Sequence, residues 1–295
     1  MFRRAMSDSW LGARGTDMET MNRTSPETAR RLFPLVGKLH EVTYSPHVHD
    51  EFVALGARNY WDGYFAGRAA PLGLASAEAV HALFYNFGPG EVARHIPFVW
   101  TLMTPEQALA ARERGSVAAL RVALGDLADS PDIARAADLA GRAAYGAATE
   151  GRALYAGLKA LPVPGEPLAR LWHVLTLLRE HRGDGHIAAL VSEGVGGLEA
   201  HMLLAIDWGM EPEKFGRIHH LPAPLLAEVL DGLQQRGWVT EAKTFTPEGR
   251  AVKDRVEALT DRLAAPAYDV LTEHEVEELI ALLEPLHAAV EAADL

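Results

Sequence analysis

A helix-start signature recurs along this chain and predicts an almost entirely α-helical fold. A serine or threonine followed by proline, in most cases with an acidic residue next, occurs at Ser25, Ser45, Thr104, Ser130 and Thr246. The hydroxyl caps free backbone N–H groups, and proline fits the first helical turn because no hydrogen bond is needed there. Apolar residues follow each signature at helical spacing, which predicts amphipathic helices around a shared core.

Proline and glycine clusters predict how the chain is divided. Residues 1–25 are polar, with no apolar run behind Arg3 and Arg4, and are expected to form a flexible tail instead of a secretory signal. Three prolines and a glycine between 162 and 167 predict a boundary near residue 163. We therefore expect a helical domain over 26–163 and a second domain over 164–295.

Charge and composition exclude several classes of site. The 295 residues include no cysteine, which excludes a disulfide framework, a thiolate zinc site, an iron–sulfur cluster and a cysteine nucleophile. The net charge of −12 disfavours binding to DNA phosphates and to anionic membranes. No apolar run reaches the roughly 18 residues needed to span a bilayer. The cytoplasm is the expected location.

Two short segments depart from the helical pattern. Residues 238–240 and 243–245 alternate like the strands of a short β-hairpin. The glycines of Arg182-Gly183-Asp184-Gly185-His186 predict a turn in which the backbone approaches a neighbour closely.

The segment from Leu225 to Leu271 resembles the C-terminal half of a MarR-type winged-helix domain. It has a helix ending in Leu233-Gln234-Gln235-Arg236-Gly237-Trp238, then the hairpin, then Thr246-Pro247-Glu248-Gly249 before a long amphipathic helix. The resemblance covers roughly residues 168–290. The whole chain also resembles an actinobacterial helix-turn-helix-like group with a Glu-His-Arg-Gly-Asp-Gly-His segment, here residues 180–186. The resemblance to the MarR-type domain implies a recognition helix followed by a wing.

A loose internal similarity extends this interpretation to the first half. Residues 67–72 align with 185–190, although the spacing to the next matching segment differs by two residues. The expected fold is therefore mainly α, with tandem winged-helix-like lobes that form a single-chain pseudo-dimer with short hairpin wings. Similarity among alanine- and leucine-rich helices is the alternative explanation.

The resemblance implies DNA contacts that the sequence supports poorly. The candidates for phosphate or base contact are Arg112, Arg114, Arg236 and Lys243. The helix implied to read DNA carries Glu228 and Asp231 and begins with two prolines. Nucleic-acid binding is therefore expected to be weak, nonspecific and salt-dependent.

Acid–base residues cluster around the glycine-flanked acid. Asp184 could orient His186, and Glu199 begins the next helix, so these three are the candidate catalytic residues. The competing interpretation is structural, with Asp184 and Glu199 supporting helix N-termini. No His-x-x-x-His pair supplies converging ligands on one helix, so no metal site is expected.

Aromatic residues concentrate between Phe52 and Trp100. They predict either plain core packing or an aromatic-walled cavity with a few polar groups. The candidate ligand-binding residues are Tyr60, Trp61, Tyr64, Arg68, His81, Tyr85, His95 and Trp100. A haem ligated by His81 or His95 is a less favoured alternative, and the sequence names no cofactor.

Two functions remain open from the sequence. The first is a protein that binds a small aromatic or apolar molecule on a MarR-like scaffold, a ligand-responsive regulator with a reduced DNA-binding surface. The second is an enzyme, acid–base, metal- or haem-dependent, that uses a cleft between the lobes. Either is expected to be a monomer or a loose homodimer with no membrane partner.

Overall fold

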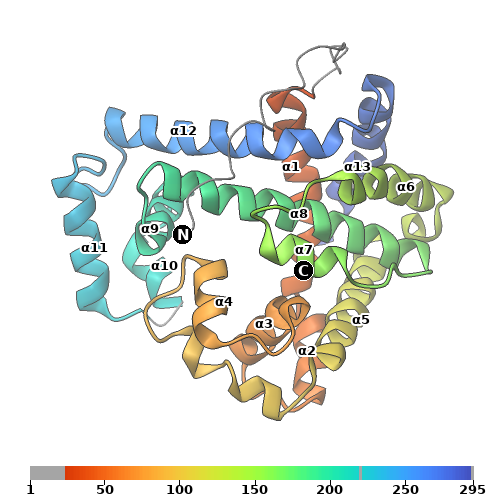
Figure 1. The fold of residues 1–295 in the computed structure, drawn as a ribbon, viewed down its shortest axis with the longest axis horizontal. Coiled ribbons are helices and arrows are strands. Elements are labelled where there is room, and N and C mark those ends of the chain that lie inside the picture. Colours follow the sequence, from red (N-terminus) through yellow and green to blue (C-terminus); the bar gives the residue numbers. More distant parts are fainter. Residues whose placement is uncertain (1–23, 219–220, 294–295) are drawn as a thin grey trace, which may run out of the picture.

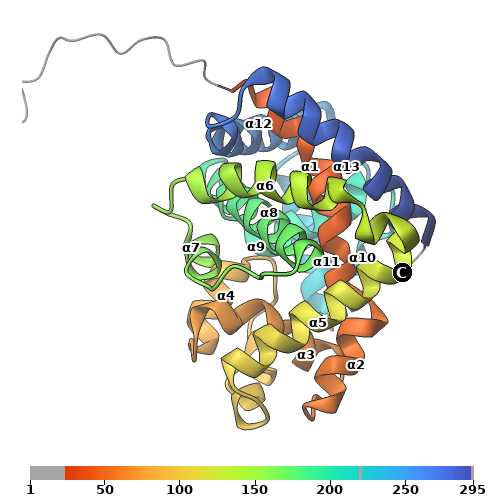
Figure 2. The same cartoon turned by 90° about the vertical axis from the view of Figure 1, so that its right-hand side faces the viewer.

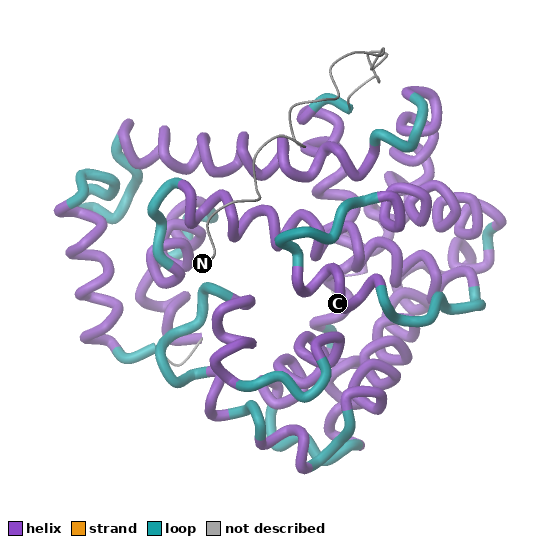
Figure 3. Tube along the Cα trace, viewed as in Figure 1, coloured by secondary structure: helices purple, strands orange, loops and turns teal. Residues whose placement is uncertain are grey.

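The computed structural model describes residues 24–218 and 221–293, which form 13 α-helices and no strand (Figure 1, Figure 3). The expected tail over 1–25 lies almost wholly outside these residues. The helices are α1 (Pro26–Glu41), α2 (Pro46–Ala54), α3 (Tyr60–Ala69), α4 (Ala77–Phe84), α5 (Pro105–Leu124), α6 (Pro131–Gly146), α7 (Ala153–Lys159), α8 (Pro167–Ser192), α9 (Gly197–Asp207), α10 (Pro212–Ile218), α11 (Ala223–Gln235), α12 (Pro247–Ala264) and α13 (Glu273–Ala293).

The helix-start signatures are confirmed. Each serine or threonine of the signature is the N-cap residue of a helix with proline in its first turn. Thr104 forms a full capping box with Gln107, and Thr246 accepts from the Gly249 amide. Ser45 is the exception because its side chain caps nothing. That hydroxyl is therefore available for another contact.

Helix α8 is the centre of the molecule. Every residue from 171 to 178 is buried, and α1, α6, α7 and α12 pack against this helix from several sides (Figure 1, Figure 2). No single helix of the described chain is long and apolar enough to cross a membrane, although α8 and α9, bent by 108° at their junction, pass that test as a pair.

The core is divided differently from the expected boundary near residue 163. The larger cluster of buried apolar residues includes helices from both expected domains, since α13 packs against α1, α5 and α6. The smaller cluster joins the end of α8 with α9, α11 and the first half of α12. Helices α9 to α11 thus form a small lobe beside a larger helical body (Figure 1).

The order of elements recurs along the chain. Helices α1 to α6 and helices α8 to α13 form two series with the same order of elements. Each series has a long helix, three shorter helices, an irregular segment, a threonine-capped long helix, a 3-10 turn and a final helix. The final helix of each series packs against the first helix of the other, α6 on α8 and α13 on α1. The alignment of 67–72 with 185–190 is not in this register, because it pairs α3 with α8.

Two local predictions were wrong. The glycine-flanked segment 183–185 is an uninterrupted part of α8, not a turn. The expected hairpin wing is a tight turn with one isolated bridge between Val239 and Phe245, because only three residues on each side of the turn can pair. The prediction of close approach at the glycines was sound, since a Cβ on Gly185 would lie 2.7 Å from Nη1 of Arg152.

The contact between α2 and α5 predicts a large stability loss on substitution of Gly115. A Cβ there would lie 2.5 Å from the Cα of Val48, so Gly115→Ala should lower the free energy of unfolding by about 1–3 kcal/mol. Gly37→Ala is the matched control in α1, where nothing lies within 4 Å, and should raise it by roughly 0.5–1 kcal/mol. Urea denaturation measures both, and equal effects would contradict the close packing.

Candidate functional site

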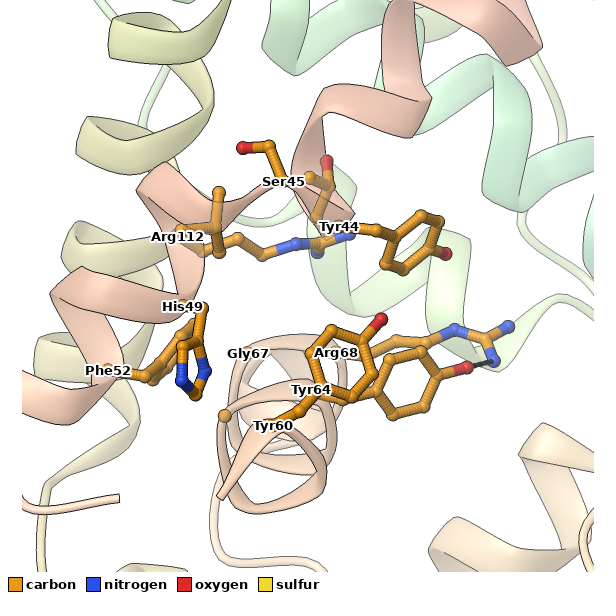
Figure 4. A pocket seen from close by; sticks show the side chains of 12 residues that line it. Tyr44, Ser45, His49, Phe52, Tyr60, Tyr64, Gly67, Arg68 and Arg112 are labelled. Atoms are coloured by element: carbon orange, nitrogen blue, oxygen red, sulfur yellow. Dashed lines mark hydrogen bonds between the residues drawn. The ribbon is translucent and has the colours of Figure 1, made fainter. Parts of the chain in front are cut away.

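A narrow cavity opens in the larger body beside α3. Its walls come from the 3-10 turn Val42–Tyr44, the adjoining α2, one face of α3, and α5 (Figure 4). The space between them is about 360 Å³ when the solvent-open part is included, whereas the cavity itself measures about 20 Å³. The walls are mainly aromatic with a few polar groups, which is the usual make-up of a small-molecule site.

The aromatic wall is built by spacing along α3. Tyr60, Tyr64 and Arg68 are four residues apart, so they lie on one helical face. Tyr64 stacks on Tyr44 with ring centroids 5.9 Å apart, and its hydroxyl accepts a 3.0 Å hydrogen bond from Arg68. Gly67 of the same helix allows Phe52 to close the cavity floor, since a Cβ there would lie 2.7 Å from that ring.

A buried carboxylate beneath the cavity neutralises part of its positive charge. Glu180 of α8 is 1% exposed and lies 3.5 Å from Nη2 of Arg68. Its other oxygen accepts a 2.7 Å bond from Arg179. Although burial opposes ionisation, the cations of Arg179 and Arg68 hold the pKa of Glu180 well below its usual range. Arg68 and Arg179 therefore share one counter-ion.

Arg112 also faces this cavity, where Figure 4 shows its side chain extending toward Tyr44. It is 3% exposed, which corrects its expected place at a DNA-facing surface, because a buried guanidinium cannot reach a phosphate. No hydrogen bond or ion pair joins it to another residue within 24–218 or 221–293, and its Nη2 has no partner. Burial lowers the pKa of Arg112, an effect that Glu180 partly offsets.

Three further polar atoms of cavity-lining residues lack partners. These are Oγ of Ser45, the helix-start hydroxyl that caps nothing, Nδ1 of His49 and Nε of Arg68. His40 lies behind the wall with its Nδ1 3.2 Å from the Thr176 hydroxyl. Burial and the nearby arginines keep the pKa of His40 well below its usual value, so this histidine adds no charge.

The structure divides the candidate ligand-binding residues. Tyr60, Tyr64 and Arg68 line the cavity. The other five candidates lie outside the cavity. Two pack in the core, Trp61 against Phe65 and Phe87 and Trp100 against the larger cluster. His81 is in α4, the Tyr85 hydroxyl donates to the Val195 carbonyl, and His95 is hydrogen-bonded to Asp62. The sequence reasoning missed Tyr44, Ser45 and His49, and assigned Arg112 to DNA contact instead of the cavity. The four-residue spacing along α3 was a signal only for Tyr60, Tyr64 and Arg68.

His95 is a core histidine held by a hydrogen bond to Asp62. Its Nδ1 lies 2.7 Å from Asp62, and its ring stacks on Phe65 at 5.0 Å. Burial opposes ionisation of Asp62, but hydrogen bonds from Arg58 and His95 lower its pKa to about 2. No group of three or more histidine, aspartate or glutamate side chains suited to a metal occurs in the described part of the chain.

The three candidate catalytic residues point to three different places. Asp184 accepts a 3.0 Å hydrogen bond from the Tyr155 amide in the first turn of α7. His186 lies 3.0 Å from the Thr260 hydroxyl of α12. Glu199 accepts from the Gly196 amide at the start of α9, as the structural interpretation expected. Asp184 also supports the N-terminus of a helix, but this helix is α7 and not the one that contains Asp184.

Burial sets the protonation of these groups. It raises the pKa of Asp184 to about 6, opposed by the Tyr155 amide. It lowers the pKa of His186 to about 4 and that of His181 to about 3. Both imidazoles are therefore neutral near pH 7, and no charged acid–base pair assembles at this part of α8.

The small lobe presents an acidic face where the resemblance implied DNA contact. Residues 223–235 contain no lysine or arginine, and Glu228 and Asp231 are exposed on α11. Arg236 is 2.9 Å from Glu199, and Lys243 pairs with Glu213. Arg114, on α5, pairs with Glu51 at 2.6 Å. The expected DNA-contact side chains thus have acidic partners or, for Arg112, are buried.

Comparison with known proteins gives one family. A profile described as a helix-turn-helix family matches residues 29–295, which is nearly the whole chain. No curated protein and no solved structure matches.

The raised pKa of Asp184 predicts how stability depends on pH. Folded Asp184 keeps its proton between its ordinary pKa of 3.8 and about 6, whereas the unfolded chain releases it, so wild-type stability should fall as pH rises through that window. Asp184→Asn keeps an acceptor for the Tyr155 amide and loses this dependence. It should be more stable than wild type at pH 7 by about 1–3 kcal/mol.

Urea denaturation between pH 4 and pH 7 measures the difference between the two proteins. Asp138→Asn, at an exposed site, is the control and should leave the pH profile unchanged. A loss of stability in Asp184→Asn that grows as pH rises would show that the charged carboxylate is favoured where it lies.

Proposed function

The chain belongs to the helix-turn-helix family, and on that premise we propose that it is a small-molecule-binding regulator. The observation that carries this proposal is the aromatic cavity with unpartnered polar atoms on its wall. Unpartnered buried polar groups are costly, so a fold retains them where something else satisfies them. The ligand would enter past Tyr60, which is 39% exposed.

Two contacts would transmit ligand binding to the small lobe. The guanidinium of Arg68 lies 4.2 Å from the centre of the Phe84 ring. The next residue, Tyr85, has a φ of 63°, a costly conformation for a non-glycine residue. Its hydroxyl donates to the Val195 carbonyl just before α9. A shift of Arg68 would therefore reach the lobe through the end of α4.

Helix α8 provides a second connection, because Glu180 beneath the cavity and Leu190 in the core of the small lobe belong to the same rigid element. A packed helix transmits displacement better than a loop does. Ligand binding would therefore change how α9 to α11 are presented.

The DNA-binding surface of this regulator would be reduced. A recognition helix inserted in the major groove needs donors and positive charge facing outward. Helix α11 instead presents Glu228 and Asp231. We propose that any binding of nucleic acid is weak and mainly electrostatic, and that the lobe acts chiefly on something other than a specific duplex.

The recurring element order supports a single-chain pseudo-dimer of MarR-like halves. In that interpretation α3 and α4 are the first-half counterparts of α10 and α11, and the cavity lies beside the first-half pair. One chain would then hold both halves of the assembly, so a monomer suffices. The enzyme alternative has no comparable support, because Asp184, His186 and Glu199 face separate elements.

Blocking the cavity tests the small-molecule function. At least one of phenol, benzamide and benzoate should raise the melting temperature of the full chain by mass action. Ser45→Leu places an apolar side chain in the cavity and should abolish that rise, whereas Ser45→Ala keeps the cavity open and should preserve it. Differential scanning fluorimetry measures both. Binding that survives in Ser45→Leu would place the ligand elsewhere.

Charge reversal on α11 tests the reduced DNA surface. Glu228→Lys with Asp231→Lys should strengthen binding to an arbitrary duplex and steepen its salt dependence by about two or more counter-ions. Asp126→Lys with Glu150→Lys makes the same change of charge in the first half and is the control. Fluorescence anisotropy measures binding. Tight wild-type binding to one duplex at physiological salt, lost on reversal, would show that α11 reads DNA.

A further inference from the structure

We propose that the cavity beside α3 recognises a small organic anion, a flat molecule with a carboxylate that pairs with Arg112. The inference rests on the proposed small-molecule function and adds the charge and geometry of the ligand. It begins from the one buried cation of the cavity that has no counter-ion.

The charges around the cavity do not balance. Arg68 and Arg179 both lie against Glu180, the acidic side chain buried there. Arg112 interacts with this carboxylate only at longer range and has no ion pair within the described residues. Its guanidinium carbon lies 5.7 Å from the centre of the Trp172 ring. No aspartate or glutamate lines the cavity, so Arg68, Arg112 and Arg179 exceed the single carboxylate of Glu180 by two charges. One anion beside Arg112 would reduce that excess.

The cost of this arrangement points to a ligand. A buried cation without a partner is strongly unfavourable. At a purely structural site, an apolar side chain would cost less folding free energy. The side chain is 3% exposed, so bulk water does not compensate it. An arginine held unpaired in a cavity is preorganised for an anion.

The chemistry of the wall selects the kind of anion. A guanidinium presents its N–H donors in a planar fork that matches a carboxylate. Ser45 and His49 add polar atoms on the same wall. The rings of Tyr44, Tyr60 and Tyr64 supply the flat apolar surfaces (Figure 4). These features favour a single-ring carboxylate over a bare inorganic ion, which would leave the aromatic wall unused.

The first experiment examines the protein without added ligand. Arg112→Met removes the uncompensated charge and keeps most of the side-chain volume, so the melting temperature should rise by about 2–4 °C. Arg152→Met is the matched control. Its guanidinium donates to the carbonyls of His181 and Leu263, so the same change there should lower the melting temperature.

The second experiment compares two isosteric probes. Benzoate and benzamide have the same shape but differ in charge. Benzoate should bind wild type at least about tenfold more tightly than benzamide. Arg112→Met should lose that preference, and Arg112→Lys should restore part of it, since lysine returns the charge without the fork. Isothermal titration calorimetry in chloride-free buffer measures each affinity.

The outcomes separate this inference from the proposed function. Equal binding of benzamide and benzoate, lost in Ser45→Leu, would overturn the anion and leave small-molecule binding intact. No binding of either probe would count against both. A lower melting temperature in Arg112→Met, as in Arg152→Met, would show that Arg112 is structural and overturn the inference whatever the probes do.

Discussion

The rest of the structure depends on the burial of α8, which is complete over residues 171–178. Polar side chains on the buried faces of this helix must find partners on other elements, because little water reaches them. Thr176 meets His40, Asp184 meets the Tyr155 amide, and His186 meets Thr260. Each contact ties a different helix to α8. The polar residues that look catalytic in the sequence are therefore attachment points, and the cavity forms where this arrangement leaves a cation unpaired.

Local signals predicted the helices well because they act within a few residues. The capping serines and threonines and the prolines after them fix helix starts whatever surrounds them. The glycines at 183 and 185 misled the prediction, and the reason for Gly185 is tertiary. Arg152 lies flat against α8 and donates to the His181 carbonyl, which a side chain at Gly185 would prevent. No local pattern distinguishes such a glycine from one in a turn.

The candidate site was predictable in part. The concentration of aromatic residues predicted a cavity or a core, and both are present on opposite sides of α3. Tyr60 and Tyr64 line the cavity, Trp61 packs on the core, and Tyr64 also contacts the core. The four-residue period marks the cavity face. Arg112 was not predictable as a cavity residue, because a charged side chain on a long helix usually faces solvent. Burial by α2 and α3, far away in sequence, reverses that expectation.

The negative charge of the whole protein makes an arginine without an acidic partner unusual. The net charge is −12, so carboxylates outnumber lysines and arginines. Exposed arginines form ion pairs with them, such as Arg31 with Glu277 and Arg135 with Glu278. Arg112, the one fully buried arginine of the described residues, has no ion pair with a carboxylate. The acidic exterior repels large polyanions, whose many phosphates cannot enter a narrow cavity. A small anion experiences a weaker repulsion and finds one strong interior attraction, so charge and size together select it.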